Sequence, residues 1–263
     1  VVYGIVGLKT HTKCALVVRR EAEGLRRYVH VGTGNYHTQT AKLYTALGLL
    51  TCDADLTAEL VELFNYLTGR SLRAEYSRLL VAPINMKDRF LALIARETGH
   101  AAAGRPSGIV AKMNSLEDRD IVLALYEASR AGVPVDLIVR GFCCLRPGVP
   151  GLSENVRVVS VLGRFLEHSR IFHFRNGAAD PLDGDWYLGS ADWMERNLQA
   201  RVEAVTPVLD RSLCERCRQI LDVMRADRRQ AWDMRPVGSY VLRRPGPEDT
   251  GPAALGTHQA LMD

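Results

Sequence analysis

The chain contains one pattern twice, and this repeat decides the fold. The first copy is HTK at 11–13 with GTGN at 32–35, and the second is HSR at 168–170 with GSAD at 189–192. In each copy a cation stands two residues after the histidine, and the sequence that follows predicts a strand, a turn and a second strand. Both glycine loops begin 21 residues after their histidine (32 − 11 and 189 − 168). The sequence therefore predicts a duplicated unit that supplies a histidine, a cation and a glycine-hydroxyl loop each time.

These side chains suit phosphate chemistry. Because positions i and i+2 of a strand face the same way, we expect each histidine to point with its cation. The pairs are His11 with Lys13 and His168 with Arg170. Phosphoryl transfer needs positioning and neutralisation of charge on the phosphate oxygens, and a neutral imidazole can attack phosphorus while a second histidine protonates the leaving oxygen. A single HxK would be a chance strand pair, but two copies at equal spacing favour a functional site.

In the surrounding sequence, short runs rich in β-branched residues alternate with stretches of helical periodicity. This alternation predicts an α/β fold. We expect strands at 14–20 and 26–32 joined by a turn at 21–24, and a helix at 56–69 closed by Gly69. A helix (86–104), a strand (108–113), a second helix (117–132) and a strand (135–141) follow. Pro83 and its polar surroundings suggest a boundary near residue 78, so we expect domains at 1–78 and 79–245 and a flexible tail at 246–263.

Composition sets broad limits. The 263 residues are 47% hydrophobic and 24% charged, as in a globular protein, and the net charge of +4 permits an anionic ligand without naming one. We expect neither a membrane span nor a secretory leader, because no apolar run is long enough and no basic leader is present. The six cysteines form no disulfide framework, so we expect a cytoplasmic protein. Cys214 and Cys217 form a lone CxxC without the second ligand pair of a zinc site, so we expect no metal site there.

The duplicated arrangement resembles the phospholipase D superfamily, in which two half-motifs meet across a pseudo-two-fold axis to form one active site. The resemblance implies two phospholipase D-like domains, each a mixed β-sheet flanked by helices. Hydrolytic members usually carry an aspartate five residues after the lysine of the motif. Here Val18 and Arg175 stand at those positions, which counts against a phosphodiesterase.

Longer strings are similar to the polyphosphate kinase family over nearly the whole chain. They include YGIVGLKTHTK, YVHVGTGNYHTQTAKLYTALGLLT, FNYLTG, PSGIVAKMNSLED, GVPVDLIVRGFCCLRPG, FLEHSRIFHF and GSADWMERNLQARVEAVTPV. The resemblance implies that His11 becomes phosphorylated and that Tyr44, Arg140 and His168 contact the nucleotide. Chemistry adds Lys13 and Arg170 as phosphate-binding cations.

Tyr44 and Arg140 can also be explained without a role in the site. Tyr44 could be an aromatic on a helix face, and Arg140 could be a solvated arginine at a strand end. Ligands of α/β sheets nevertheless gather at the carboxyl ends of strands, where Arg140 is expected. As supporting residues around the site we expect His30, Thr33, Asn35 and Ser190. Three further histidines are left out of the site: His37, His100 and His173.

The resemblance implies a reversible transfer of the ATP γ-phosphate to inorganic polyphosphate through phosphohistidine. It implies Mg²⁺ as cofactor, although no acidic ligand cluster is apparent in the sequence. The implied partners are ATP or ADP, polyphosphate and further copies of the full-length chain, with no nucleic acid. Peripheral membrane association is compatible with the resemblance.

The resemblance also implies that the chain begins within a domain. Family members carry an amino-terminal domain, a helical domain and the first part of the His11 domain, so we expect Val1 to be a truncation point and the fragment alone to be inactive. Two alternatives stay open beside the kinase. One is a phospholipase D-like phosphodiesterase, and the other is an inactive polyanion-binding fragment.

Overall fold

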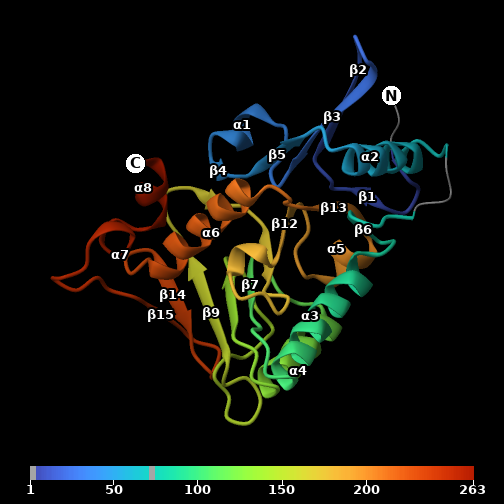
Figure 1. Cartoon of the computed structure of the whole chain (residues 1–263). Helices are drawn as coiled ribbons and strands as arrows, with labels where there is room; N and C mark the ends of the chain where they lie inside the picture. The colour runs from blue at the N-terminus through green and yellow to red at the C-terminus, as the bar shows by residue number, and fades with distance from the viewer. Residues whose placement is uncertain (1–3, 71–74) are drawn as a thin grey trace.

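A computed structural model describes residues 4–70 and 75–263 (Figure 1). The first part of the chain forms a three-stranded antiparallel sheet in the order β2–β3–β5, and helix α2 packs against it. The β2–β3 hairpin confirms the expected turn at 21–24, and the positive φ of Gly69 follows the end of α2 as predicted. The elements are β1 (Lys9–Thr10), β2 (Cys14–Glu21), β3 (Gly24–Gly32), α1 (Thr38–Ala41), β4 (Tyr44–Thr45), β5 (Gly48–Thr51) and α2 (Ala54–Leu67).

The second part is built on a ten-stranded mixed sheet in the order β1–β13–β12–β11–β7–β8–β9–β14–β15, with β6 also paired to β13. Strands β7, β8 and β9 run parallel, which is the arrangement expected from alternating strands and helices. The elements are β6 (Leu80–Ala82), α3 (Met86–Ala102), β7 (Ile109–Met113), α4 (Arg119–Arg130), β8 (Val135–Val139), β9 (Val156–Val161), β10 (Leu166–Glu167), β11 (Ile171–Phe174), η1 (Pro181–Asp183), β12 (Asp185–Gly189), α5 (Glu195–Gln199), β13 (Arg201–Pro207), α6 (Arg211–Ala226), β14 (Ala231–Met234), β15 (Tyr240–Leu242), α7 (Gly251–Leu255) and α8 (Thr257–Met262).

Helices cover both faces of the large sheet, α3 and α4 on one and α6 on the other (Figure 1). Under α3 the core is aromatic: the Phe90 ring lies 4.9 Å from Phe172 and 5.5 Å from Trp193, centroid to centroid. Under α6 the core includes the two cysteines of the CxxC, Cys214 and Cys217, as buried side chains of the helix. Apolar residues three and four apart give each helix one buried stripe, so the sheet is closed from both sides.

A third core joins the two parts of the chain. Val29 and Leu63 of the first part pack in one cluster with Val202 and Ala204 of β13. Strand β1 also pairs in parallel with β13, although the two are separated by most of the sequence. The three-stranded sheet therefore sits on the edge of the large one and shares its core.

The α/β class is confirmed. Within residues 1–78, β2, β3 and β5 form an antiparallel sheet, while β1 and β4 pair in parallel with β13 and β10. One detail needs correction: the HTK and HSR motifs lie outside strands, in the connections between β1 and β2 and between β10 and β11. The side-by-side orientation expected from strand geometry therefore does not apply to these motifs.

The segment 246–263 packs on the body of the protein instead of forming a loose tail. Helices α7 and α8 lie against α6, and Thr257 and His258 are buried. The carboxylate of Asp227, at the end of α6, explains this docking because it is fully buried and needs donors. The backbone N–H and the hydroxyl of Thr257 donate to one of its oxygens at 2.7 and 2.6 Å.

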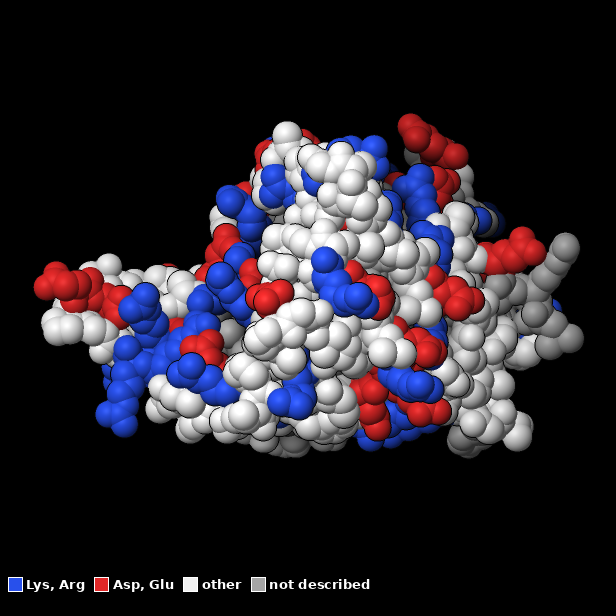
Figure 2. Space-filling view, turned by 90° about the horizontal axis from the view of Figure 1, so that it is seen from below, with Lys and Arg blue, Asp and Glu red and all other residues white. Residues whose placement is uncertain are grey.

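The outer surface opposite the first part of the chain carries both charge signs. Figure 2 shows lysines and arginines mixed with acidic residues over this lower face, without one continuous basic field. Among residues 4–70 and 75–263, no helix has the length and apolar character needed to span a bilayer.

Removal of the Thr257 hydroxyl should loosen the docked segment. Thr257→Val keeps the shape but leaves the buried Asp227 carboxylate with one donor fewer, which should cost about 1–3 kcal/mol. Thermal unfolding and hydrogen exchange of α8 would measure the loss. The matched control is Thr250→Val, because Thr250 is exposed and its side chain makes no cap hydrogen bond to the described chain. Equal stability of the two variants would contradict the docking role of Asp227.

Candidate active site

Two short parallel strand pairs bring the histidines into one site. Strand β1 pairs with β13, and the His11 N–H then donates to the Val202 carbonyl at 2.9 Å. Strand β10 pairs with β4, and the His168 N–H donates to the Thr45 carbonyl at 3.0 Å. Each histidine is thus fixed by a strand from the other part of the chain, so the site forms only when both parts are together.

The His11 ring is held by a buried carboxylate. Its Nδ1 lies 2.8 and 2.9 Å from the two oxygens of Glu203, which is fully buried, while the His11 side chain stays 18% exposed. Ser190 and Asn197 donate to the same carboxylate, Asn197 at 2.6 Å. A carboxylate only accepts, so we assign the ring proton to Nδ1, which leaves the Nε2 lone pair free. This geometry prepares Nε2 of His11 to act as a nucleophile.

The two motif cations hold the backbone of their own histidines. Lys13 is 5% exposed and donates to the His11 carbonyl, and Arg170 donates to the His168 carbonyl at 2.7 Å. Burial lowers the pKa of Lys13 to about 8, although the Glu203 carboxylate opposes the shift. The cations therefore accompany their histidines as expected, through a carbonyl contact that the strand argument did not foresee.

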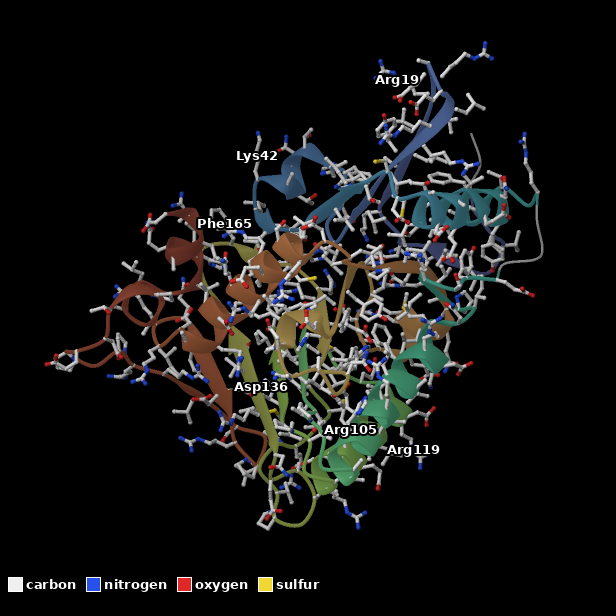
Figure 3. All side chains as sticks on the ribbon, in the orientation of Figure 1. Arg19, Lys42, Arg105, Arg119, Asp136 and Phe165 are labelled. Atoms are coloured by element: carbon white, nitrogen blue, oxygen red, sulfur yellow. The ribbon has the colours of Figure 1, made fainter. Side chains whose placement is uncertain are left out.

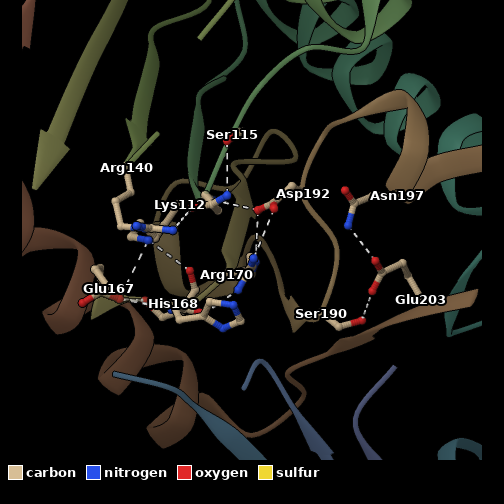
Figure 4. A network of polar contacts seen from close by, with 12 residues as sticks. Lys112, Ser115, Arg140, Glu167, His168, Arg170, Ser190, Asp192, Asn197 and Glu203 are labelled. Atoms are coloured by element: carbon tan, nitrogen blue, oxygen red, sulfur yellow. Dashed lines mark hydrogen bonds and ion pairs between the residues drawn. The ribbon is translucent and has the colours of Figure 1, made fainter. Parts of the chain in front are cut away.

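Arg170 is also locked by the second glycine loop. Its Nε and Nη2 donate to the two oxygens of Asp192 at 3.0 and 3.1 Å (Figure 4). Burial disfavours the charged form of Asp192, but the Arg170 charge and the Asn114 N–H, at 2.6 Å, outweigh it and hold the pKa below its usual value. The guanidinium fork of Arg170 is thus already engaged, and its effect on a ligand comes from charge and positioning.

Tyr44 and Arg140 lie beside His168. Tyr44 belongs to strand β4, and its ring centroid is 5.1 Å from that of His168, so the helix-face reading of this residue is wrong. Arg140 follows β8, is half-buried, and donates to the Asn114 side chain (Figure 4). Its buried Nε has no hydrogen-bond partner among the described residues. A half-buried guanidinium with an unused donor is suited to an anionic ligand.

His168 differs electrostatically from His11. Burial, and next the positive charge of Arg170, lower the pKa of His168 to about 3. Its buried Nδ1 has no hydrogen-bond partner in the described part of the chain. The proton-donor role expected for His168 requires an imidazolium, and a pKa of about 3 keeps the ring neutral at physiological pH.

The remaining expected residues have three different kinds of surroundings. Ser190 is bonded to Glu203, and Thr33 closes its own loop by accepting from the Leu47 N–H at 2.9 Å. Asn35 is exposed, and the His30 ring lies 2.5 Å from the Tyr36 hydroxyl, on the hairpin side. The structure thus gathers Ser190 into the site, gives Thr33 a loop-closing contact, and shows no contact of His30 or Asn35 with the histidines.

The basic hairpin near the first motif also lies apart. Arg19 is at the far end of the β2–β3 hairpin, which projects away from the body of the protein (Figure 3). Phe165 and Lys42, in contrast, lie on the side where α8 meets β4 and β10 (Figure 3). The basic residues of the hairpin therefore do not line the two-histidine site.

The sequence patterns did not identify four buried residues of this network: Lys112, Glu167, Asn197 and Glu203. Lys112 donates to the Ser169 carbonyl at 3.1 Å and lies 3.8 Å from Glu167, and burial lowers its pKa to about 8. A signal existed for two of the four, because Lys112 and Glu203 are charged residues inside apolar strands and such residues must be paired when buried.

The fold and site define a class of protein: an α/β protein with a duplicated two-histidine site, lined by buried cations and suited to phosphoryl chemistry. Comparison with known proteins agrees. The family model "Polyphosphate kinase C-terminal domain 2" matches residues 79–251, and "Polyphosphate kinase C-terminal domain 1" matches residues 1–73. The chain belongs to the polyphosphate kinase family.

Individual relatives support the assignment. The chain is 56% identical to a polyphosphate kinase of Thermosynechococcus vestitus and 57% identical to one of Synechocystis sp., in both cases over 100% of its own length. It covers only 35% and 36% of those proteins, so it spans about a third of their length. A crystal structure of polyphosphate kinase from Porphyromonas gingivalis superposes with a TM-score of 0.90 at 36% identity, over 99% of this chain and 40% of that one.

The neutral state of His168 is measurable. With a pKa of about 3, its ring should show constant NMR shifts between pH 8 and pH 5, and a His168→Gln variant would identify its signals. Between pH 6.5, the ordinary pKa of histidine, and about pH 3, His168 is protonated in the unfolded chain but neutral in the folded protein. This group therefore lowers the stability of the fold as pH falls through that window. A midpoint near 6.5 would show that the ring is not desolvated.

Proposed function

We propose that this chain is the catalytic part of a polyphosphate kinase, which transfers the γ-phosphate of ATP reversibly to inorganic polyphosphate through a phosphohistidine at His11. The observation that carries the proposal is the contact of His11 Nδ1 with the buried Glu203 carboxylate, since it leaves Nε2 as the free nucleophile. Membership of the family supports the substrates.

The reaction has two steps that balance. In the first, the Nε2 lone pair of His11 forms a bond to the γ-phosphorus, the bond to the bridging oxygen breaks, and ADP leaves with that electron pair. In the second, a terminal oxygen of polyphosphate attacks the same phosphorus and the N–P bond breaks, which lengthens the chain by one unit. The Nδ1 proton stays on the ring throughout, and Glu203 stabilises the positive charge that phosphorylation creates there.

The surrounding cations bind the phosphates. Lys13 and the half-buried guanidinium of Arg140 are cations of this site, and Arg170 adds charge while its fork stays with Asp192. In this proposal the neutral His168 donates a ring N–H to the nucleotide and gives up no proton. The leaving group is already a stable anion, so transfer does not require an imidazolium.

Magnesium is a separate question. Among the described residues, no group of three or more histidine, cysteine or acidic side chains could hold an ion. Glu203 and Asp192 already accept hydrogen bonds from His11 and Arg170. The described residues, 4–70 and 75–263, therefore do not fit a resident Mg²⁺ site, and the proposed steps use none.

The phosphodiesterase alternative finds less support. Arg175 donates to the carbonyls of Ala178 and Ala179, and Val18 is exposed on the hairpin, so neither supplies the carboxylate of the hydrolytic motif. The inactive-fragment alternative concerns this segment by itself, because it spans a third of its relatives.

Labelling tests the proposal. In an enzyme of full family length that carries this segment, ATP labelled at the γ-phosphate should place acid-labile, base-stable label on His11. His11→Ala should abolish that label, whereas His37→Ala, an exposed histidine outside the site, should retain it. Release of label only as free phosphate, with none on the protein, would favour hydrolysis and overturn the proposal.

Arg170→Lys separates charge from geometry. Lysine keeps the charge but cannot make the two-point contact with Asp192, so about 1.5–3 kcal/mol of positioning should be lost, and the transfer rate should fall about 10- to 100-fold. Single-turnover rates would measure it. Arg175→Lys is the control, since Arg175 binds only backbone carbonyls away from the histidines. Unchanged kinetics for Arg170→Ala would remove this residue from the site.

A further inference from the structure

The two halves of the site are related by one constant sequence offset of 157 residues (168 − 11). The offset holds for paired backbone contacts as well as for the motifs. Lys9 pairs with Arg201 and Thr10 with Val202; in the other half, Leu166 pairs with Tyr44 and Glu167 with Thr45. Adding 157 to the first member of each pair, and subtracting it from the second, converts one set into the other. Each half therefore supplies the other with the equivalent strand contact.

The glycine loops obey the same offset. Thr33 exchanges two hydrogen bonds with Leu47: its N–H donates to the Leu47 carbonyl and its hydroxyl accepts from the Leu47 N–H, both at 2.9 Å. Ser190 exchanges the corresponding pair with Ala204, at 3.0 and 3.3 Å. Since 190 − 33 and 204 − 47 both equal 157, the register is kept from the histidines to the loops.

At one position the halves differ in chemistry. Glu203 holds His11 Nδ1, and its counterpart 157 residues earlier is Ala46. Ala46 directly follows Thr45, which accepts from the His168 N–H, just as Glu203 follows Val202, which accepts from the His11 N–H. A methyl group accepts no hydrogen bond. The buried Nδ1 of His168 accordingly has no partner among the described residues.

We propose that Ala46 determines which histidine becomes phosphorylated: with alanine in place of the orienting carboxylate, His168 lacks the partner that would fix its tautomer and stabilise a charged phosphoimidazole. The inference rests on the proposed function. Ala46 is exposed, so its substitution removes no side chain from the core. The duplicated site thus holds one histidine with an orienting carboxylate and one histidine without such a partner among the described residues.

The test restores the carboxylate. In the full-length enzyme, His11→Ala should carry no phosphohistidine, whereas His11→Ala with Ala46→Glu should carry label from γ-labelled ATP on His168, mapped by mass spectrometry. The gain over His11→Ala should be at least ~10²-fold, the usual size of a contribution from one positioned acid or base. The matched control is His11→Ala with Ala46→Gln, which adds the same bulk without the charge and should stay unlabelled.

A second readout does not depend on activity. In the 263-residue chain, Ala46→Glu should raise the pKa of His168 from about 3, as followed by NMR, while Ala46→Gln should leave it low. One outcome would overturn this inference and leave the proposed function standing. In that outcome the unsubstituted enzyme carries label on His11, the folded double variant carries none on His168, and Ala46→Glu does not change the pKa of His168. Absence of label from the unsubstituted enzyme would overturn the proposed function itself. Equal effects of Ala46→Glu and Ala46→Gln on the labelling and the pKa of His168 would show that side-chain bulk acts there instead of charge, and would overturn the inference.

Discussion

The site depends on the buried carboxylate of Glu203. It accepts from His11, which comes from the first part of the chain, and from Ser190 and Asn197 of the second part. An isolated buried carboxylate is strongly unfavourable, and three side-chain donors are what make its burial tolerable. The same contacts that satisfy the charge therefore also hold the two halves together and set the tautomer of His11, the proposed nucleophile. The contacts that complete this part of the fold are also the ones that fix the His11 ring.

Three cations of the site lie in surroundings that disfavour their charged form. Lys13 and Lys112 both have pKa values lowered to about 8, in each case mainly by burial. Arg140 also has a lowered pKa, with burial again the largest cause, and keeps an unpaired donor within the described chain. Such groups are held in a less favourable state than in water, and an anionic ligand that pairs with them stabilises the folded protein by linkage. In the proposed function, phosphate oxygens are the anions that pair with these cations.

Local patterns in the sequence predicted much of the fold. The β2–β3 hairpin, helices α2, α3 and α4, and strands β7 and β8 followed from periodicity, turns and caps. The repeat located both histidines and Ser190. Residue spacing could not give the β1–β13 and β10–β4 pairs, because two-residue strands carry no periodic signal and their partners lie far away in the chain. The docking of Thr257 was hidden for a related reason, since a proline- and glycine-rich segment gives no hint of a buried acceptor at Asp227.

The asymmetry of the two histidines follows from what a duplicated unit can and cannot share. The strand pairs between the halves are made by backbone groups and do not depend on the side chains. Both halves therefore keep the same register and hold the backbone of their histidines in the same way. The hydrogen bonding of each ring, in contrast, depends on one side chain of the opposite strand: Glu203 for His11 and, by the 157-residue offset, Ala46 for His168. A carboxylate accepts from the ring N–H and so fixes the tautomer, whereas a methyl group cannot. One fold repeated twice can therefore hold its two histidines in different surroundings, with the difference confined to a side chain that no backbone contact requires.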